Sequence, residues 1–145
     1  MIEVPLVRLD ADLPLPAYAR PGDAAVDLMA RDDAVLAAAG GRAIVATGVA
    51  VAIPAGYAGL VLPRSGLAAR HGITVLNTPG LVDSGYRGEL RVVLVNTDPT
   101  DDYQVTRGDR VAQLLIHAVE AVAFTPVDAL PGSERGGGGF GHTGR

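Results

Sequence analysis

Turn signals interrupt this chain at short intervals, so that the apolar segments between them are short. The 145 residues include 19 glycines and 10 prolines, the two residue types that most strongly favour turns. The main turn signals are PGD at 21–23, PAG at 54–56, DSG at 83–85, TDPTDD at 97–102 and RGD at 107–109. The apolar segments are Ile2–Leu9, Ala25–Met29, Val49–Ile53, Leu60–Leu62, Ile73–Leu76, Leu90–Val95 and Val111–Val119. Short strands at this spacing predict an all-β fold, either a sandwich or a barrel.

Two segments of the sequence have features of a helix. One short helix is predicted at Ser65–His71, where Ser65 can act as the N-cap and Gly72 can end the helix. A longer helix competes with a strand further on, because the apolar residues of Val111–Val122 recur at helical spacing. The turn before this segment and the strand-rich context favour a strand, which we predict there.

The longest segment without a charge, residues 43–63, has the length of a membrane span. Glycines and prolines interrupt it, however, and Val49, Val51 and Ile53 alternate with alanines. We therefore predict two strands joined by a tight turn, and no membrane partner. The first residues, MIEVPLVRLD, lack the basic start and apolar run of a signal peptide, and the chain has no cysteine. A cytoplasmic protein is expected.

Composition narrows the chemistry that this chain can carry out. The net charge of -4 disfavours a nucleic-acid partner, so local arginines must bind any anionic ligand. The lack of cysteine excludes disulfides, thiol catalysis and cysteine-ligated zinc, and the three histidines have no metal-ligand spacing. Aromatic residues make up only 4% of the chain, so the core of its single domain must consist of valine, leucine, isoleucine and alanine.

Two stretches combine polar residues in patterns that suit a nucleotide. PRSGLA at 63–68 places an arginine before a helix, which predicts a phosphate site; the alternative is an N-capped surface helix with a solvated arginine. NTPGLVDSGYRGE at 77–89 carries Asn77, Asp83 and Tyr86, which can converge on one face. Such a set suits a small heterocyclic ligand and a carboxylate that activates water, although an aspartate in this position can also serve the turn alone.

Two further polar residues lie inside apolar strands. Asp27 interrupts AAVDLM, where a carboxylate is costly to bury without partners, so it either accepts from turn N–H groups or belongs to a site. Gln113 in GDRVAQ either faces solvent or reaches a ligand. The sequence contains no GxSxG nucleophile elbow, and because it has no lysine it cannot contain a phosphate-binding GxxxxGK[ST] loop.

Five stretches, in this order, resemble the five motifs of the trimeric deoxyuridine triphosphatases (dUTPases). They are PGDAAVDL at 21–28, PRSGLA at 63–68, NTPGLVDSGYRGE at 77–89, GDRVAQLLI at 108–116 and RGGGGFGHTG at 135–144. The resemblance spans nearly the whole chain. It implies a jelly-roll-like β-barrel or sandwich with one short helix, and a homotrimer with active sites at the subunit interfaces. It also implies hydrolysis of dUTP to dUMP and pyrophosphate, with Mg²⁺ on the triphosphate.

The same resemblance implies a role for each matching residue. Asp83 would be the general base, Tyr86 would pack against the deoxyribose and exclude a 2′-hydroxyl, and Asn77 would read the uracil together with the hairpin backbone. Asp27 would meet Mg²⁺ through bound water. The implied substrate-binding residues are Arg64, Ser65, Gly66, Asn77, Gly80, Leu81, Val82, Tyr86, Gln113, Arg135, Phe140, Gly141 and Thr143.

The glycine-rich stretch at 131–145 is predicted to be a mobile arm that follows a β domain at 1–130. In the family this arm closes over another subunit's site, which implies that Arg135 meets the terminal phosphate, Phe140 stacks on uracil and Thr143 donates to phosphate. Two positions depart from the family's usual pattern, since Ala25 replaces a glycine and His142 a serine.

Two alternatives to a dUTPase remain at the level of sequence. One is the related dCTP deaminase fold, whose members are longer and lack the RGGGGFGHTG arm. The other is a protein that keeps the fold and senses nucleotides without turning them over.

Overall fold

Short strands dominate the protein, which confirms the all-β prediction. The computed structural model describes residues 1–139, and these form ten strands and one helix. In chain order they are β1 (Leu6–Arg8), β2 (Val26–Met29), β3 (Ala34–Leu36), β4 (Arg42–Val51), β5 (Tyr57–Leu62), α1 (Ser65–His71), β6 (Ile73–Val75), β7 (Gly80–Val82), β8 (Glu89–Asn96), β9 (Tyr103–Val105) and β10 (Arg110–Ala118).

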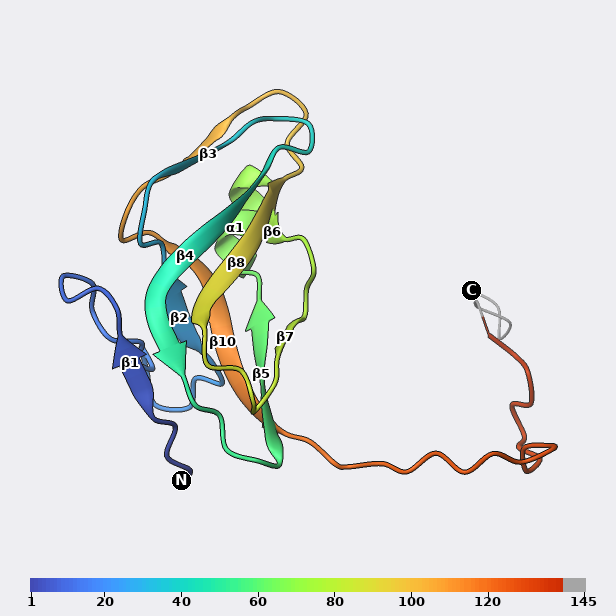
Figure 1. The fold of residues 1–145 in the computed structure, drawn as a ribbon. Helices are drawn as coiled ribbons and strands as arrows, with labels where there is room; N and C mark the ends of the chain where they lie inside the picture. Colours follow the sequence, from blue (N-terminus) through green and yellow to red (C-terminus); the bar gives the residue numbers. More distant parts are fainter. Residues whose placement is uncertain (140–145) are drawn as a thin grey trace.

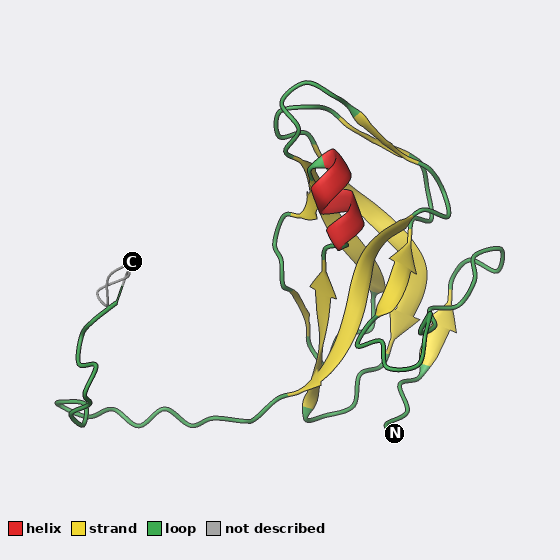
Figure 2. Ribbon diagram, turned by 180° about the vertical axis from the view of Figure 1, so that it is seen from behind, coloured by secondary structure: helices red, strands yellow, loops and turns green. Residues whose placement is uncertain are grey.

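The strands form two four-stranded antiparallel sheets and one separate pair (Figure 1). The first sheet has the order β1-β4-β8-β6, the second has the order β2-β10-β5-β7, and β3 pairs with β9. Neighbouring strands come from distant parts of the chain, as in a jelly-roll-like sandwich. The helix α1 contacts β6 and lies at the end of the sandwich that also carries β3 (Figure 2).

The core lies between the two sheets and contains the residue types that the composition predicts. Every buried hydrophobic residue in the described part of the chain is a leucine, valine, isoleucine or alanine. Two polar side chains are buried among them, and both are paired. Thr47 donates to the Leu90 carbonyl at 2.7 Å, and Asn96 donates to the carbonyls of Leu36 and Asp101 at 3.0 and 2.8 Å. Both buried polar side chains therefore have hydrogen-bond partners.

Most of the predicted elements are confirmed. The uncharged stretch at 43–63 forms β4 and β5 with a turn between them, and the ambiguous segment after residue 110 is a strand, β10. The N-terminal strand is shorter than predicted, because Leu6–Arg8 alone pairs with β4 at the edge of its sheet. Pro5 precedes it and has no N–H to extend the ladder.

The helix has the predicted bounds but a different N-cap. Gly72 ends it in the left-handed conformation, with φ of 64°. Arg64, and not Ser65, is the N-cap residue, with extended dihedrals of φ −90° and ψ 126°. The extended chain of β5 continues through Pro63 to Arg64, so Ser65 is already helical and cannot cap the helix.

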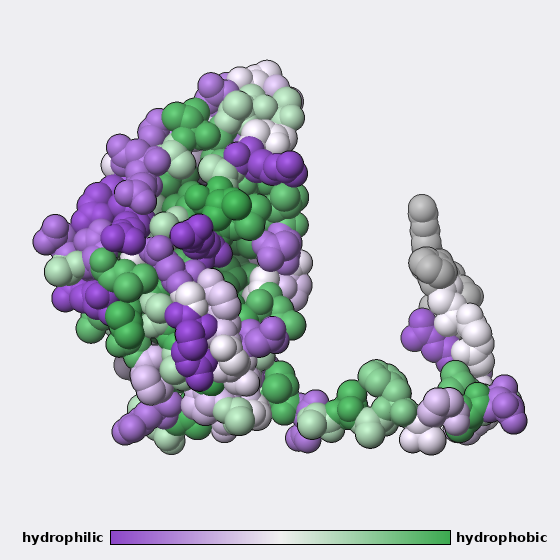
Figure 3. All heavy atoms as spheres, viewed as in Figure 1, coloured by the Kyte–Doolittle hydropathy of each residue, from purple (hydrophilic) through white to green (hydrophobic). Residues whose placement is uncertain are grey.

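Regular structure ends at Ala118, and the chain then runs away from the two sheets (Figure 1). Apolar side chains gather along this trailing segment (Figure 3). Val122, Phe124 and Leu130 are 72%, 93% and 85% exposed. Several large apolar side chains exposed close together are unusual in a folded protein. The one helix in residues 1–139 has seven residues, far short of a bilayer span.

Candidate active site

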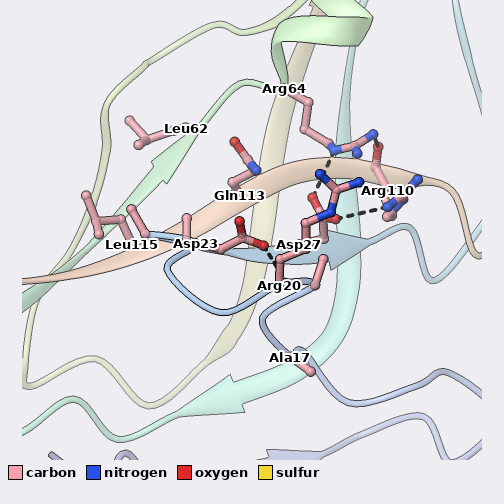
Figure 4. Close-up of a pocket in the computed structure, with 12 residues that line it drawn as sticks. Ala17, Arg20, Asp23, Asp27, Leu62, Arg64, Arg110, Gln113 and Leu115 are labelled. Carbon is pink, nitrogen blue, oxygen red and sulfur yellow. Dashed lines mark hydrogen bonds and ion pairs between the residues drawn. The ribbon is translucent and has the colours of Figure 1, made fainter. Parts of the chain in front are cut away.

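Three neighbouring strands of the second sheet line a cleft. Gln113 on β10 lies between its register partners Asp27 on β2 and Leu62 on β5. Arg64 follows the end of β5 after Pro63, and its guanidinium reaches the same cleft (Figure 4). The cleft has a volume of about 490 Å³, within the range of small-molecule sites. We call it the arginine cleft; its lining includes Arg20, Asp23, Ala25, Asp27, Leu62, Arg64, Arg110 and Gln113.

Two arginines converge on the Asp27 carboxylate, which is only 16% exposed (Figure 4). Arg64 donates from Nε to Oδ1 at 2.9 Å, and Arg110 donates from Nη1 to Oδ2 at 3.4 Å. Arg64 also donates to the Arg110 carbonyl at 3.2 Å. The partners of Asp27 are therefore guanidinium groups, and the alternative of a carboxylate bound by turn N–H groups is not what the structure shows. The cleft holds more positive than negative charge, which suits an anionic ligand.

Arg110 is a cleft residue that the sequence did not single out. Strict alternation along β10 would place residues 110 and 113 on opposite faces of the sheet. The pairing with β2 shifts between Arg110 and Ala112, however, so a β-bulge inserts one residue there. Val111 and Ala112 are consequently both buried, and Arg110 lines the same cleft as Gln113.

A second, smaller cleft lies beside the turn after β7. We call it the tyrosine cleft; it has a volume of about 190 Å³ and is lined by Leu81, Val82, Asp83, Tyr86, Leu90 and Arg91. Its turn is closed by a hydrogen bond from the Tyr86 N–H to the Asp83 carbonyl at 3.0 Å. Arg87 donates to the Ser84 carbonyl at 2.6 Å, which holds the same turn from outside. Asp83 and Tyr86 are thus brought together, as predicted.

Asn77 is placed differently from that prediction. Its amide lies over Gly80, where an added Cβ would come within 3.3 Å of Nδ2, and Asn77 does not line the tyrosine cleft. Gly80, Leu81 and Val82 form β7, which pairs with β5. Asn77 is therefore beside the Gly80 end of the hairpin backbone that it was expected to assist, and not in the cleft itself.

The two clefts are separated along the length of β5. Gly59 pairs with Val82, so Asp83 lies opposite Ala58, while Arg64 follows the other end of the strand. Six residues at about 3.3 Å each place the backbones of Asp83 and Arg64 about 20 Å apart in one chain. This separation along β5 places Asp83 and Arg64 of the same chain in different clefts.

The remaining predicted residues lie outside both clefts or outside the described part of the chain. Arg135 lies on the trailing segment, where its Nε donates to the Gly138 carbonyl at 2.7 Å. Phe140, Gly141, His142 and Thr143 are not among the described residues 1–139. Ala25 lines the arginine cleft; among the described residues only Ala39 is a non-glycine with positive φ, so alanine replaces glycine at 25 without strain.

The carboxylates of the arginine cleft fit a magnesium ion only as outer ligands. Residues 1–139 contain no group of three or more acidic, histidine or cysteine side chains that could hold a metal. Asp27 is already paired with two arginines. Mg²⁺ commonly keeps several waters and is bound through one or two carboxylates together with substrate phosphates. The carboxylates present here fit an ion bound through waters and substrate phosphates, and they do not surround a metal ion by themselves.

Comparison with known proteins places this geometry in a family. The dUTPase family model matches residues 11–144. The deoxyuridine 5′-triphosphate nucleotidohydrolase of Thermobifida fusca is 60% identical over 143 residues, which are 99% of this chain and 79% of that protein. This chain belongs to the dUTPase family. It is accordingly a nucleotide hydrolase of the dUTP diphosphatase class, and the resemblance read from its five motifs is confirmed.

Solved structures agree with the fold. The dUTPase of Staphylococcus bacteriophage 80alpha, determined with dUpNHpp, matches with a TM-score of 0.91 and 27% identity over 100% of both chains. A dUTPase variant from phage phi11 of S. aureus, described for the coordination of a structural Mg(II) ion, matches with a TM-score of 0.82 and 24% identity over 90% of this chain and 100% of that one. The jelly-roll-like sandwich is therefore the family's fold.

Proposed function

We propose that this dUTPase hydrolyses dUTP by attack of water on the α-phosphorus, with Asp83 as the general base. Asp83 takes a proton from the water as the new P–O bond forms. The bond between the α-phosphorus and its bridging oxygen breaks, and dUMP and pyrophosphate leave. The observation that carries this proposal is that Asp83 and Tyr86 line one cleft at the end of β7. A positioned base of this kind contributes about 10²–10⁴-fold to the rate.

The tyrosine cleft is the proposed nucleoside side of the site. The backbone of β7, at Gly80, Leu81 and Val82, reads the edge of uracil, with Asn77 beside Gly80. Tyr86 packs against the deoxyribose and leaves no room for a 2′-hydroxyl. Its ring is 45% exposed in the single chain, so it has surface to offer a sugar.

The arginine cleft is the proposed triphosphate side. Arg64 and Gln113 of this cleft hold the phosphates, and Arg110 adds a second guanidinium. Ser65 and Gly66, which begin α1 directly after Arg64, complete the proposed phosphate site. Asp27 would hold a Mg²⁺ ion through bound water. When bound, the ion supplies neutralisation of the charge on the triphosphate. Phosphoryl transfer depends mainly on such positioning and charge neutralisation.

We propose further that the site is shared between subunits of a homotrimer. The separation of about 20 Å between Asp83 and Arg64 supports this, because each cleft then needs the other cleft from a second chain. The arm at 131–145 completes the site, with Arg135 on the terminal phosphate, Phe140 stacked on uracil, and Gly141 and Thr143 at the phosphates. In the cell, the reaction would limit uracil in DNA and supply dUMP for dTMP synthesis.

Substitution of Asp83 tests the mechanism. Asp83→Asn should lower kcat for pyrophosphate release from dUTP by about 10²–10⁴-fold, because the amide cannot accept the proton. Its Kd for dUpNHpp should stay near that of the unsubstituted enzyme. Asp32→Asn, which changes an exposed aspartate outside both clefts, is the control. An unchanged kcat would remove Asp83 from the role, and release of ammonia from dCTP would favour a deaminase.

A further inference from the structure

Gly88 has no room for a side chain, and the obstacle is Tyr86. A Cβ built at Gly88 would lie 2.7 Å from Cζ and 3.2 Å from Cε2 of the Tyr86 ring, and closer still to its Oη. Contacts below 3.0 Å do not occur for real Cβ atoms. The tyrosine ring therefore occupies the space that any other residue at position 88 would fill.

A fixed hydrogen bond holds the ring in that space. The Tyr86 hydroxyl donates to the Glu89 backbone carbonyl at 3.0 Å. Glu89 begins β8, and its carboxylate accepts from the Gly48 N–H at 2.9 Å and from Arg31 at 3.3 Å. Leu90, the next residue, is 2% exposed. The acceptor for Tyr86 is thus anchored to β4 and to the core, so the position of the ring is set by the scaffold.

We propose that Gly88 is a positioning residue that determines the sugar specificity of the enzyme through the pose of Tyr86. This inference rests on the proposed packing of Tyr86 against the deoxyribose. Without a Cβ at 88, the ring folds back onto the chain and reaches Glu89. With a Cβ, the ring must move away, and the wall that excludes a 2′-hydroxyl moves with it.

The physical cost of such a change falls on the ring and not on the fold. Gly88 is not among the glycines with positive φ, so alanine can adopt its backbone conformation. Tyr86 is 45% exposed, and its ring can rotate into solvent. A Gly88→Ala protein should therefore fold normally and show its defect in substrate choice.

The experiment compares two glycine-to-alanine variants from the same turn. Gly88→Ala should raise the UTP-to-dUTP ratio of kcat/KM by about 10-fold, the scale of discrimination for one small group in a pocket. Gly85→Ala is the matched control, because a Cβ there meets nothing within 4 Å and its φ is not positive. Gly85→Ala should leave the ratio unchanged, and both variants are checked by thermal unfolding.

Tyr86→Ala separates the two levels of the proposal. If Tyr86→Ala leaves the UTP-to-dUTP ratio unchanged, the proposed role of Tyr86 fails. If Tyr86→Ala changes the ratio but Gly88→Ala leaves it unchanged, only the inference about Gly88 is overturned. Adding Gly88→Ala to Tyr86→Ala should change nothing further, since Gly88 acts only through the ring. If Gly88→Ala alone fails to fold, the double variant decides: it folds like Tyr86→Ala if the ring is the obstacle, and a double variant that also fails to fold overturns the proposal.

Discussion

At the scale of residues, charged side chains tie loops to the sheets at defined points. Arg107 binds the Asp10 carboxylate with two nitrogens, and Arg31 lies 3.6 Å from the same carboxylate. These contacts connect the N-terminal loop, the β2–β3 turn and the turn before β10. The hydrogen bond from Arg107 is the main reason that the pKa of Asp10 lies well below its ordinary value.

This lowered pKa predicts an acid-dependent loss of stability. The pKa is lower in the folded protein than the value of 3.8 for the free side chain, so the charged form stabilises the fold above about pH 4. That stabilisation is lost as pH falls below this value toward the folded pKa. We expect the Tm difference between the unsubstituted protein and Asp10→Asn to stay constant from about pH 7 to pH 5 and to shrink toward pH 3. Asp12→Asn removes the exposed neighbour 3.9 Å from Arg107, and a similar pH profile for that variant would contradict the assignment to Asp10.

Single residues of the site were predictable, but their partners were not. Asp27 stood out as a carboxylate inside an apolar strand, and Asp83 as an aspartate within a motif. Nothing in the order of the sequence indicated that Arg64 and Arg110 would both reach Asp27. Those contacts depend on β2, β5 and β10 lying side by side, which is a property of the sheet.

At the scale of elements, the limits of pattern reading are visible in β10. Its apolar residues follow helical spacing, yet it forms a strand between β2 and β5, because pairing on both sides outweighs the local pattern. The bulge beside Arg110 then reverses the expected face of that residue. A bulge is a feature of how two strands pair, so strict alternation in one stretch of sequence could not predict it.

Gly59 in β5 lies in a closely packed part of the core. A Cβ at Gly59 would lie 2.9 Å from Ile53 Cδ1, 3.1 Å from Leu114 Cδ1 and 3.2 Å from Val82 Cβ. We expect Gly59→Ala to lower the free energy of unfolding by about 1–3 kcal/mol through overpacking, measured by urea denaturation. Gly85→Ala, in open space, should cost far less. Equal stability of the two variants would mean that the side chains around Gly59 move aside at no measurable cost, and it would contradict this prediction.

At the scale of the whole molecule, the single chain carries two separated clefts, which we propose are complementary halves of a site, and an exposed apolar tail. The motifs predicted that such halves exist, but not how far apart they lie. Only the register of β5 with β7 gives the separation of about 20 Å between Asp83 and Arg64. Val122, Phe124 and Leu130 likewise remain exposed in the described part of the chain, and the sequence did not indicate this exposure. Both observations agree with the proposed association of further copies of the chain.

Shared sites predict that two inactive variants can restore activity together. Asp83→Asn damages the tyrosine cleft and Arg64→Ala damages the arginine cleft, so each variant alone should hydrolyse dUTP poorly. In oligomers formed from an equal mixture, some interfaces combine the intact tyrosine cleft of one subunit with the intact arginine cleft of the other. Random assembly makes about a quarter of the interfaces complete, and pyrophosphate release should recover to about that fraction of the unsubstituted rate.

The control for this experiment pairs Asp83→Asn with the double variant Asp83→Asn/Arg64→Ala. That mixture contains no intact Asp83 and should stay as inactive as its parents. The subunits are co-refolded from denaturant with different tags, so that mixed oligomers can be captured and their formation verified before the assay. Mixed oligomers of the two single variants that remain inactive would place both clefts in one chain's own site. That result would require a movement of about 20 Å within the chain, along a strand paired on both sides, to bring Asp83 to the phosphates.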